Sequence, residues 1–66
     1  MSEFHDRYIA RREVESILGL SRSTIYKLLA NGDFPPPIKL IGRTVRWRKS
    51  EILAWADTRA AANAPR

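Results

Sequence analysis

The sequence has no cysteine, a single histidine and no long apolar run within its 66 residues. It therefore has no disulfide, and His5 lacks the Cys or His partners of a structural zinc site. Disulfides and metals support many domains of this size, so here the fold must depend on its apolar core. No apolar run approaches the roughly 18 residues of a membrane span, and residues 1–7 are too polar for a signal peptide. We expect a soluble cytoplasmic protein of one domain without metal or cofactor.

Acidic residues are scarce in the middle of the chain. The net charge is +5, but residues 21–50 carry seven basic residues and one acidic residue. Residues 1–20 sum to −1, and residues 51–66 sum to zero. An ordinary solvated surface mixes both signs, whereas a block of one sign indicates a polyanionic partner. The charge pattern therefore favours a nucleic acid as the partner.

Apolar residues recur at helical spacing in two segments, residues 11–18 and 22–30. Gly19 follows the first segment and favours the left-handed conformation that ends many helices, and Ser21 is a good N-cap for the second. A short, glycine-containing turn between two helices is typical of the helix-turn-helix. The apolar stripes are Val14, Ile17 and Leu18, followed by Ile25, Leu28 and Leu29.

The second half of the chain predicts a crossing segment, a hairpin and a third helix. Three prolines at 35–37 exclude a helix and a central strand, and Phe34 beside them is expected in the core. Two strands are predicted at residues 38–40 and 45–48, joined by a turn at 41–44. Ser50 is expected to cap the third helix, whose buried stripe is Ile52, Trp55 and Ala56, with Leu53 on its flank.

The ends of the chain show weaker patterns. Residues 1–7 are interpreted as a flexible leader and residues 61–66 as a frayed tail, so that the domain spans residues 8–60. Tyr8 and Ile9 form an apolar pair that suits either a brief strand or a staple against the first helix.

In this order the elements predict an α+β fold, mainly α with a small β-hairpin: a winged helix-turn-helix of three helices and a two-stranded wing. The second helix would enter the major groove of DNA, and the wing would lie along the backbone or an adjacent minor groove. A helical wheel places Ser23, Lys27 and Ala30 opposite the apolar stripe. The residues predicted to bind DNA are Arg22, Ser23, Thr24, Tyr26 and Lys27 on the helix and Lys39, Arg43, Thr44, Arg46 and Arg48 on the wing.

Several of these residues also have a structural interpretation. Thr24 is either a first-turn filler or a DNA contact. Cations on the wing can guard an edge strand against aggregation, but five within eleven residues favour phosphate binding. Trp47 and Trp55 could stack on bases, but their strand and helix positions favour the core.

Short motifs in a fixed order carry a resemblance to a known family. They are Arg12–Val14, Leu18–Tyr26, Gly32–Pro35, Pro37–Leu40, Arg46-Trp47, Ser50–Ile52 and Ala54-Trp55. Across residues 8–59 the chain resembles the AlpA family of phage and prophage regulators, small relatives of MerR-like winged-helix proteins and phage excisionases.

The resemblance implies a DNA-binding protein of a mobile element. It implies regulation of integrase-region promoters, or excision with an integrase as partner, and location at the bacterial nucleoid. It supports the DNA contacts of the second helix and of Arg43 and Arg46. Two positions depart from the family pattern: Glu15 replaces a small residue in the first helix, which predicts a wider or rotated approach of the second helix, and Ala10 lacks a capping hydroxyl.

Other functions remain open at this stage. Transcriptional regulation and excision control are not separable from these residues. A protein-interaction module would need an exposed apolar patch, which the helical wheels do not provide. RNA binding would need several exposed aromatics, and only Tyr26 fits. A proline-rich ligand is too short here, and no nucleophile–base pair or metal set indicates an enzyme. We expect a monomer that binds DNA cooperatively, because no heptad pattern follows the third helix.

Overall fold

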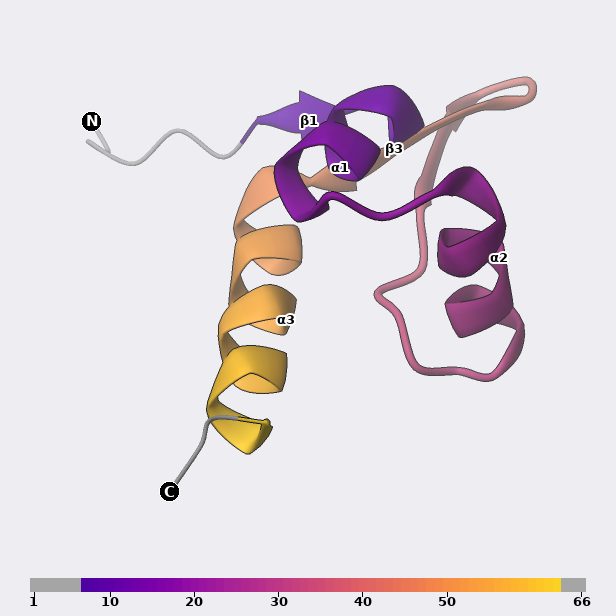
Figure 1. The fold of residues 1–66 in the computed structure, drawn as a ribbon. Helices are drawn as coiled ribbons and strands as arrows, with labels where there is room; N and C mark the ends of the chain where they lie inside the picture. Colours follow the sequence, from indigo (N-terminus) through magenta and orange to yellow (C-terminus); the bar gives the residue numbers. More distant parts are fainter. Residues whose placement is uncertain (1–6, 64–66) are drawn as a thin grey trace, which may run out of the picture.

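The computed structural model describes residues 7–63, which form three helices and a three-stranded antiparallel sheet (Figure 1). This is the α+β, winged-helix arrangement that the sequence predicts. In Figure 1, α2 and the tip of the β-hairpin lie on one side of the molecule and α3 on the other. The elements are β1 (Tyr8–Ile9), α1 (Arg11–Leu18), α2 (Arg22–Ala30), β2 (Ile38–Ile41), β3 (Thr44–Arg48) and α3 (Lys49–Ala62).

Both helices of the helix-turn-helix have the bounds expected from their apolar spacing, and the caps between them are also confirmed. Gly19 adopts a left-handed conformation with φ 68°, and its N–H donates to the Glu15 carbonyl at 2.7 Å. Ser21 caps α2 because its Oγ accepts the backbone N–H of Thr24 at 3.2 Å. The chain therefore reverses over residues 19–21 and presents α2 as a separate helix.

The sheet contains one strand more than the predicted wing. Tyr8 pairs with Arg48 and Ile9 with Trp47, so β1 joins the edge of β3 and the strand order is β1-β3-β2. The backbone N–H of Lys49 also donates to the Arg7 carbonyl at 2.8 Å. Of the two alternatives for Tyr8 and Ile9, the structure shows the strand, with Ile9 buried in the core.

The hairpin turn is shorter than predicted. The strands extend to Ile41 and from Thr44, which leaves only Gly42 and Arg43 in the turn. Gly42 has φ 53° and Arg43 a negative φ, as a type II′ turn requires. The register shifts between Lys39 and Ile41, so Leu40 is an extra residue that bulges from β2.

The predicted start of the third helix is wrong. α3 begins at Lys49 with Arg48 in the N-cap position and no side-chain cap bond, so Ser50 lies inside the first turn. The cause is that β3 runs directly into α3, and the pairing of the Lys49 N–H with Arg7 replaces a cap. At its other end α3 includes Ala61 and Ala62, which the sequence assigned to the tail. Residues 1–6 of the expected leader and 64–66 of the tail lie outside the described residues.

The core lies between the helices and the inner face of the sheet. Phe34 is buried there as predicted, with its ring edge-on to Trp47 and to Trp55 at centroid distances of 6.4 and 4.8 Å. Trp47 is buried in the core, as predicted. Trp55 is half-buried and packs against the core, so its predicted place in the core is confirmed for part of its side chain. Ile17 was expected in the α1 stripe but is 37% exposed. The buried hydrophobic residues of the described chain are Ile9, Val14, Ile25, Phe34, Trp47 and Ile52.

The two indoles also fix the proline segment. Trp47 donates its Nε1–H to the Pro35 carbonyl at 2.9 Å, and Trp55 donates to the Asp33 carbonyl at 2.8 Å. Carbonyls in a segment with three prolines have few backbone donors nearby, so side-chain donors satisfy them. The crossing from α2 to β2 is therefore held against the core from both sides.

Candidate nucleic-acid interface

The outer face of α2 is polar, basic and exposed, as the helical wheel predicts. Arg22, Ser23, Tyr26 and Lys27 are all exposed, while Ile25 on the opposite side is buried. The core therefore fixes the rotation of the helix, and the face left outside carries hydroxyls, cations and one aromatic. Side chains of these kinds contact base edges and phosphates in DNA complexes.

Thr24 belongs to the helix cap rather than to the open face. Its side chain is half-buried, and its Oγ1 lies 2.9 Å from the Ser21 Oγ, which is also 3.2 Å from the Ser23 Oγ. Of the two interpretations left open for Thr24, the structure favours the first-turn role. The three hydroxyls form one cluster at the start of α2.

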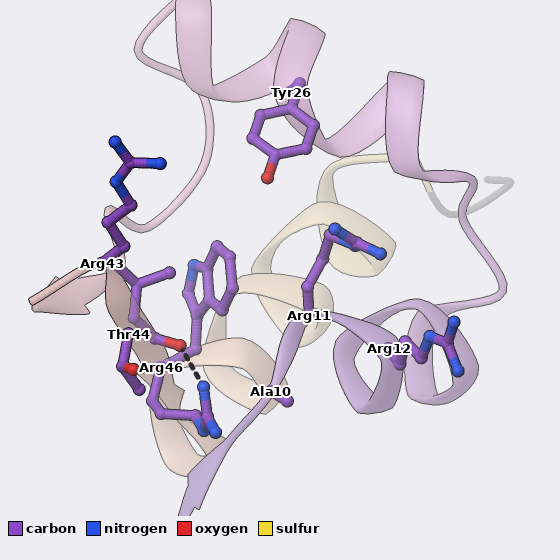
Figure 2. A pocket seen from close by; sticks show the side chains of 9 residues that line it. Ala10, Arg11, Arg12, Tyr26, Arg43, Thr44 and Arg46 are labelled. Atoms are coloured by element: carbon purple, nitrogen blue, oxygen red, sulfur yellow. Dashed lines mark hydrogen bonds between the residues drawn. The ribbon is translucent and has the colours of Figure 1, made fainter. Parts of the chain in front are cut away.

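Tyr26 connects α2 with the rest of the interface. The Arg22 guanidinium lies 5.6 Å from the centroid of its ring, a distance typical of a cation–π contact. Figure 2 shows the hydroxyl end of the ring pointing away from α2, toward α1 and the wing. Tyr26 thus holds one predicted contact residue beside it and extends toward a second group of them.

That second group lies on the wing. Arg43 is exposed in the turn, Thr44 is half-buried at the start of β3, and Arg46 is half-buried two residues further on. One Arg46 NH group donates to the carbonyl of Val45 at 2.8 Å, which folds the side chain back along the strand (Figure 2). The guanidinium is therefore positioned by the backbone rather than free to swing.

A pocket of about 340 Å³ lies where α1, α2 and the wing meet, and we call it the notch (Figure 2). Among the described residues that line the notch, four are arginines and none is acidic. It brings together four residues that the sequence assigned to two separate elements: Tyr26 from α2, and Arg43, Thr44 and Arg46 from the wing. The full lining is Ala10, Arg11, Arg12, Tyr26, Arg43, Thr44, Val45, Arg46 and Trp47.

Sequence reasoning missed Arg11 and Arg12. They lie in the first turn of α1, in the part of the chain whose charges sum to −1, so the block pattern gave no reason to select them. Their adjacency at a helix start was the only signal, and it did not indicate which way they face. Both residues line the notch from α1, across from the wing, and in Figure 2 the Arg12 side chain extends to the side of α1 away from the wing.

The two arginines are in different electrostatic situations. The Arg11 Nε donates to the Glu15 Oε2 at 2.7 Å, an i,i+4 ion pair on α1. Hydrogen bonding to Glu15, and secondarily to Tyr26, raises the pKa of Arg11 above its ordinary value. No ion pair or hydrogen bond engages Arg12 within residues 7–63. Glu15, the departure from the family pattern, therefore anchors Arg11 and leaves Arg12 as the open cation of α1.

Two predicted wing contacts do not join the notch. Lys39 pairs with Val45, and directly opposed residues of an antiparallel ladder share a face of the sheet, so Lys39 and Arg46 lie on opposite faces. Arg48 shares the face of Arg46, but its guanidinium lies 5.5 Å from the centroid of the Tyr8 ring. The wing cations are thus divided among three places rather than gathered in one patch.

The described surface also carries more apolar area than the helical wheels suggested. Ile41 is 75% exposed and Leu40 50% exposed at the end of the wing, and Leu53 is exposed on α3. The expectation of a single exposed aromatic is wrong as well, since Tyr8 is 48% exposed. The wheels could not show this because most of the excess lies on the sheet.

The residues of this site lie within a region that is similar to known proteins. The profile of the family described as prophage CP4-57 regulatory protein (AlpA) matches residues 7–60, which include every residue that lines the notch. The chain belongs to the AlpA family of prophage regulatory proteins. The resemblance noted in the sequence is thereby confirmed.

AlpA-family membership agrees with a second similarity. The chain is 46% identical over 56 residues to the protein ORF88 of Enterobacteria phage P4, a match that covers 85% of this chain and 64% of the relative. The chain therefore spans somewhat less than two thirds of the length of that phage protein. No solved structure matches the chain described here. Within residues 7–63, no helix combines the length and the apolar character needed to cross a bilayer.

Proposed function

We propose that this AlpA-family protein binds double-stranded DNA in a sequence-specific manner and regulates a promoter or attachment site of a mobile element. The observation that carries the proposal is the continuity between the exposed face of α2 and the arginines of the notch. Membership of a prophage regulatory family and similarity to a phage protein support the biological setting.

The docking geometry follows from the elements. A helix of nine residues whose outer face is polar fits the major groove, which admits one α-helix. With α2 in the groove, the hairpin beside it would reach the flanking backbone or minor groove, as wings do. Lys27 lies in the centre of the outward face and is the residue best placed to read a base edge.

The convergent groups favour binding rather than catalysis. The charged groups that line the notch are all guanidinium groups, which stay protonated at any physiological pH and so cannot act as general bases. Their planar forks suit bidentate recognition of phosphate oxygens. We therefore propose a DNA-binding regulator, with control of excision alongside an integrase as the alternative form of the same activity.

A selection from randomised duplex DNA tests the proposal. We expect retention of a pool that converges on one motif, with binding to unrelated duplex at least about a thousandfold weaker. Absence of retention at low ionic strength would contradict DNA binding. Retention without convergence would contradict sequence specificity and leave only a general DNA-binding protein.

The two biological forms can be separated on the same selected site. A regulator is expected to change transcription from a promoter that contains the motif, in the absence of any integrase. An excision factor is expected to change the ratio of excision to integration when the motif lies in an attachment site. Activity in only one of the two assays assigns the role.

A further inference from the structure

We propose that the notch holds one backbone phosphate of the bound duplex, so that α1 takes part in the interface together with α2 and the wing. The proposal rests on the proposed DNA binding and specifies one subsite within it. It assigns a direct phosphate contact to Arg12, a residue that neither the charge pattern nor the helical wheel selects. The remaining donors come from Tyr26, Arg43 and Arg46.

The size and lining of the notch favour a small anion. Its volume of about 340 Å³ lies at the lower end of the range of roughly 300–1,000 Å³ that small-molecule sites occupy. Four arginines, a tyrosine and a threonine stand among its nine lining residues, so it offers many hydrogen-bond donors. A tetrahedral oxyanion matches this excess of donors.

The donors come from three elements and remain available. Arg46 commits one N–H to the Val45 carbonyl and retains the others, because a guanidinium has five. The Tyr26 hydroxyl points into the same space, and Arg12 has no partner among the described residues. Arg11 is paired with Glu15 and so acts as a positioning residue that fixes this side of the notch.

The place of the notch fits the path of a DNA strand. It lies between α2, which would occupy the major groove, and the wing, which would reach the neighbouring groove. A sugar–phosphate backbone separates these two grooves, so one strand would pass over the notch when both elements are docked. A phosphate held there would fix the register of α2 along the duplex without reading sequence.

A double-mutant design on protein and DNA tests the assignment. Single phosphates of the selected duplex are replaced in turn by uncharged methylphosphonates, and binding of the wild-type protein, Arg12→Ala and Arg12→Lys is measured. We expect one position at which the replacement weakens wild-type binding about tenfold, as the loss of a charge-assisted bond would. On the duplex modified at that position, Arg12→Ala should bind less than about twofold more weakly than the wild-type protein, because the contact it would remove is already missing.

Two variants make the result specific. Lys39→Ala removes the same charge from the opposite face of the wing and should keep the full sensitivity at that phosphate, whatever its own affinity. Arg12→Lys keeps the charge but not the planar fork, so it should retain only part of the sensitivity. Arg12 is exposed, so no variant should melt below the wild type, which excludes misfolding.

The possible failures can be told apart. If the selection yields no bound duplex, the proposed function fails and this proposal fails with it. If DNA binds but no phosphate is coupled to Arg12, the notch assignment is wrong while the function stands. Inorganic phosphate alone provides the last arm: saturable binding that Arg12→Ala abolishes, without coupling on DNA, would identify a free-anion site and overturn the DNA assignment.

Discussion

The N-cap residue of α2 has a hydroxyl group and that of α1 has none. Ser21 caps α2 through its Oγ, whereas Ala10 precedes α1 in an extended conformation with no capping group. We expect Ala10→Ser to raise the free energy of unfolding by about 1 kcal/mol, because it offers an acceptor to the first turn. Thermal denaturation should show a melting temperature higher by roughly 4–8 °C. Ser21→Ala is the matched control and should lower stability by a similar amount; an unchanged Ala10→Ser would show that α1 is already capped.

Lys27 provides the corresponding prediction for recognition. It is exposed at the centre of the outward face of α2, so Lys27→Ala should reduce discrimination between the selected site and one with a changed base pair by about 1–3 kcal/mol. Competition binding with single-base variants measures this. Arg43→Ala, at the wing, should instead weaken all duplexes about equally. Undiminished discrimination in Lys27→Ala would show that another residue reads the bases.

Single residues were predictable where a local pattern determines them. Ser21 and Gly19 lie at fixed offsets from periodic apolar residues, so their roles could be read directly from the sequence. Thr24 was undecided because a hydroxyl in the first helical turn suits both a cap and a phosphate contact. Arg11 and Arg12 were missed because the three-dimensional packing of α1 against the wing, and not their neighbours in the chain, places them in the notch.

Among the elements, the wing depends most closely on one backbone conformation. Gly42 has φ 53°, which costs a residue with a side chain about 1–2 kcal/mol, although the space around it is open. Gly42→Ala should therefore destabilise the hairpin by about that amount in urea denaturation, through backbone strain alone. Thr58→Ala, an exposed change in α3, should stay within about 0.5 kcal/mol of wild type. Equal stability of the two variants would contradict the observed turn.

The bounds of an element were predictable where a helical period and a capping signal occur together. α1 and α2 have enough residues for a helical period to appear, and their bounds are confirmed. β1 has two residues, too few for any period, so its pairing with β3 could only be an alternative. The bulge at Leu40 turns Lys39 away from Arg46, and no alternation rule anticipates an extra residue. α3 was displaced because a strand that continues directly into a helix leaves no capping signal.

For the whole molecule, the concentration of arginines around the notch predicts that salt acts in opposite directions on folding and binding. Like charges brought together by folding repel each other, and salt screens that repulsion. Raising the salt concentration from low to moderate values should therefore raise the melting temperature of the free protein. The same change should weaken DNA binding steeply, because released counterions drive association. Arg12→Ala should reduce the slope of log affinity against log salt by about one, and a melting temperature that falls with salt would contradict the clustering.

The charge block of the sequence indicates a polyanion, the class of partner that we propose, but not where on the molecule it would lie. The four arginines of the notch form two pairs, Arg11 with Arg12 and Arg43 with Arg46, that lie more than thirty positions apart in the chain, and only the fold brings the pairs to one place. The basic middle of the chain is in fact dispersed, with Lys39 and Arg48 directed elsewhere. Position in the chain therefore indicated the kind of partner that we propose, but not the shape of the site.

The placement of Trp47 has a practical consequence. Its indole lies in the wall of the notch, while the second indole, Trp55, lies against Phe34 and under the Arg59 guanidinium. A Trp55→Phe protein would therefore hold a single tryptophan, in the wall of the proposed phosphate site. Its emission would report occupancy there directly, in solution and without any label on either molecule.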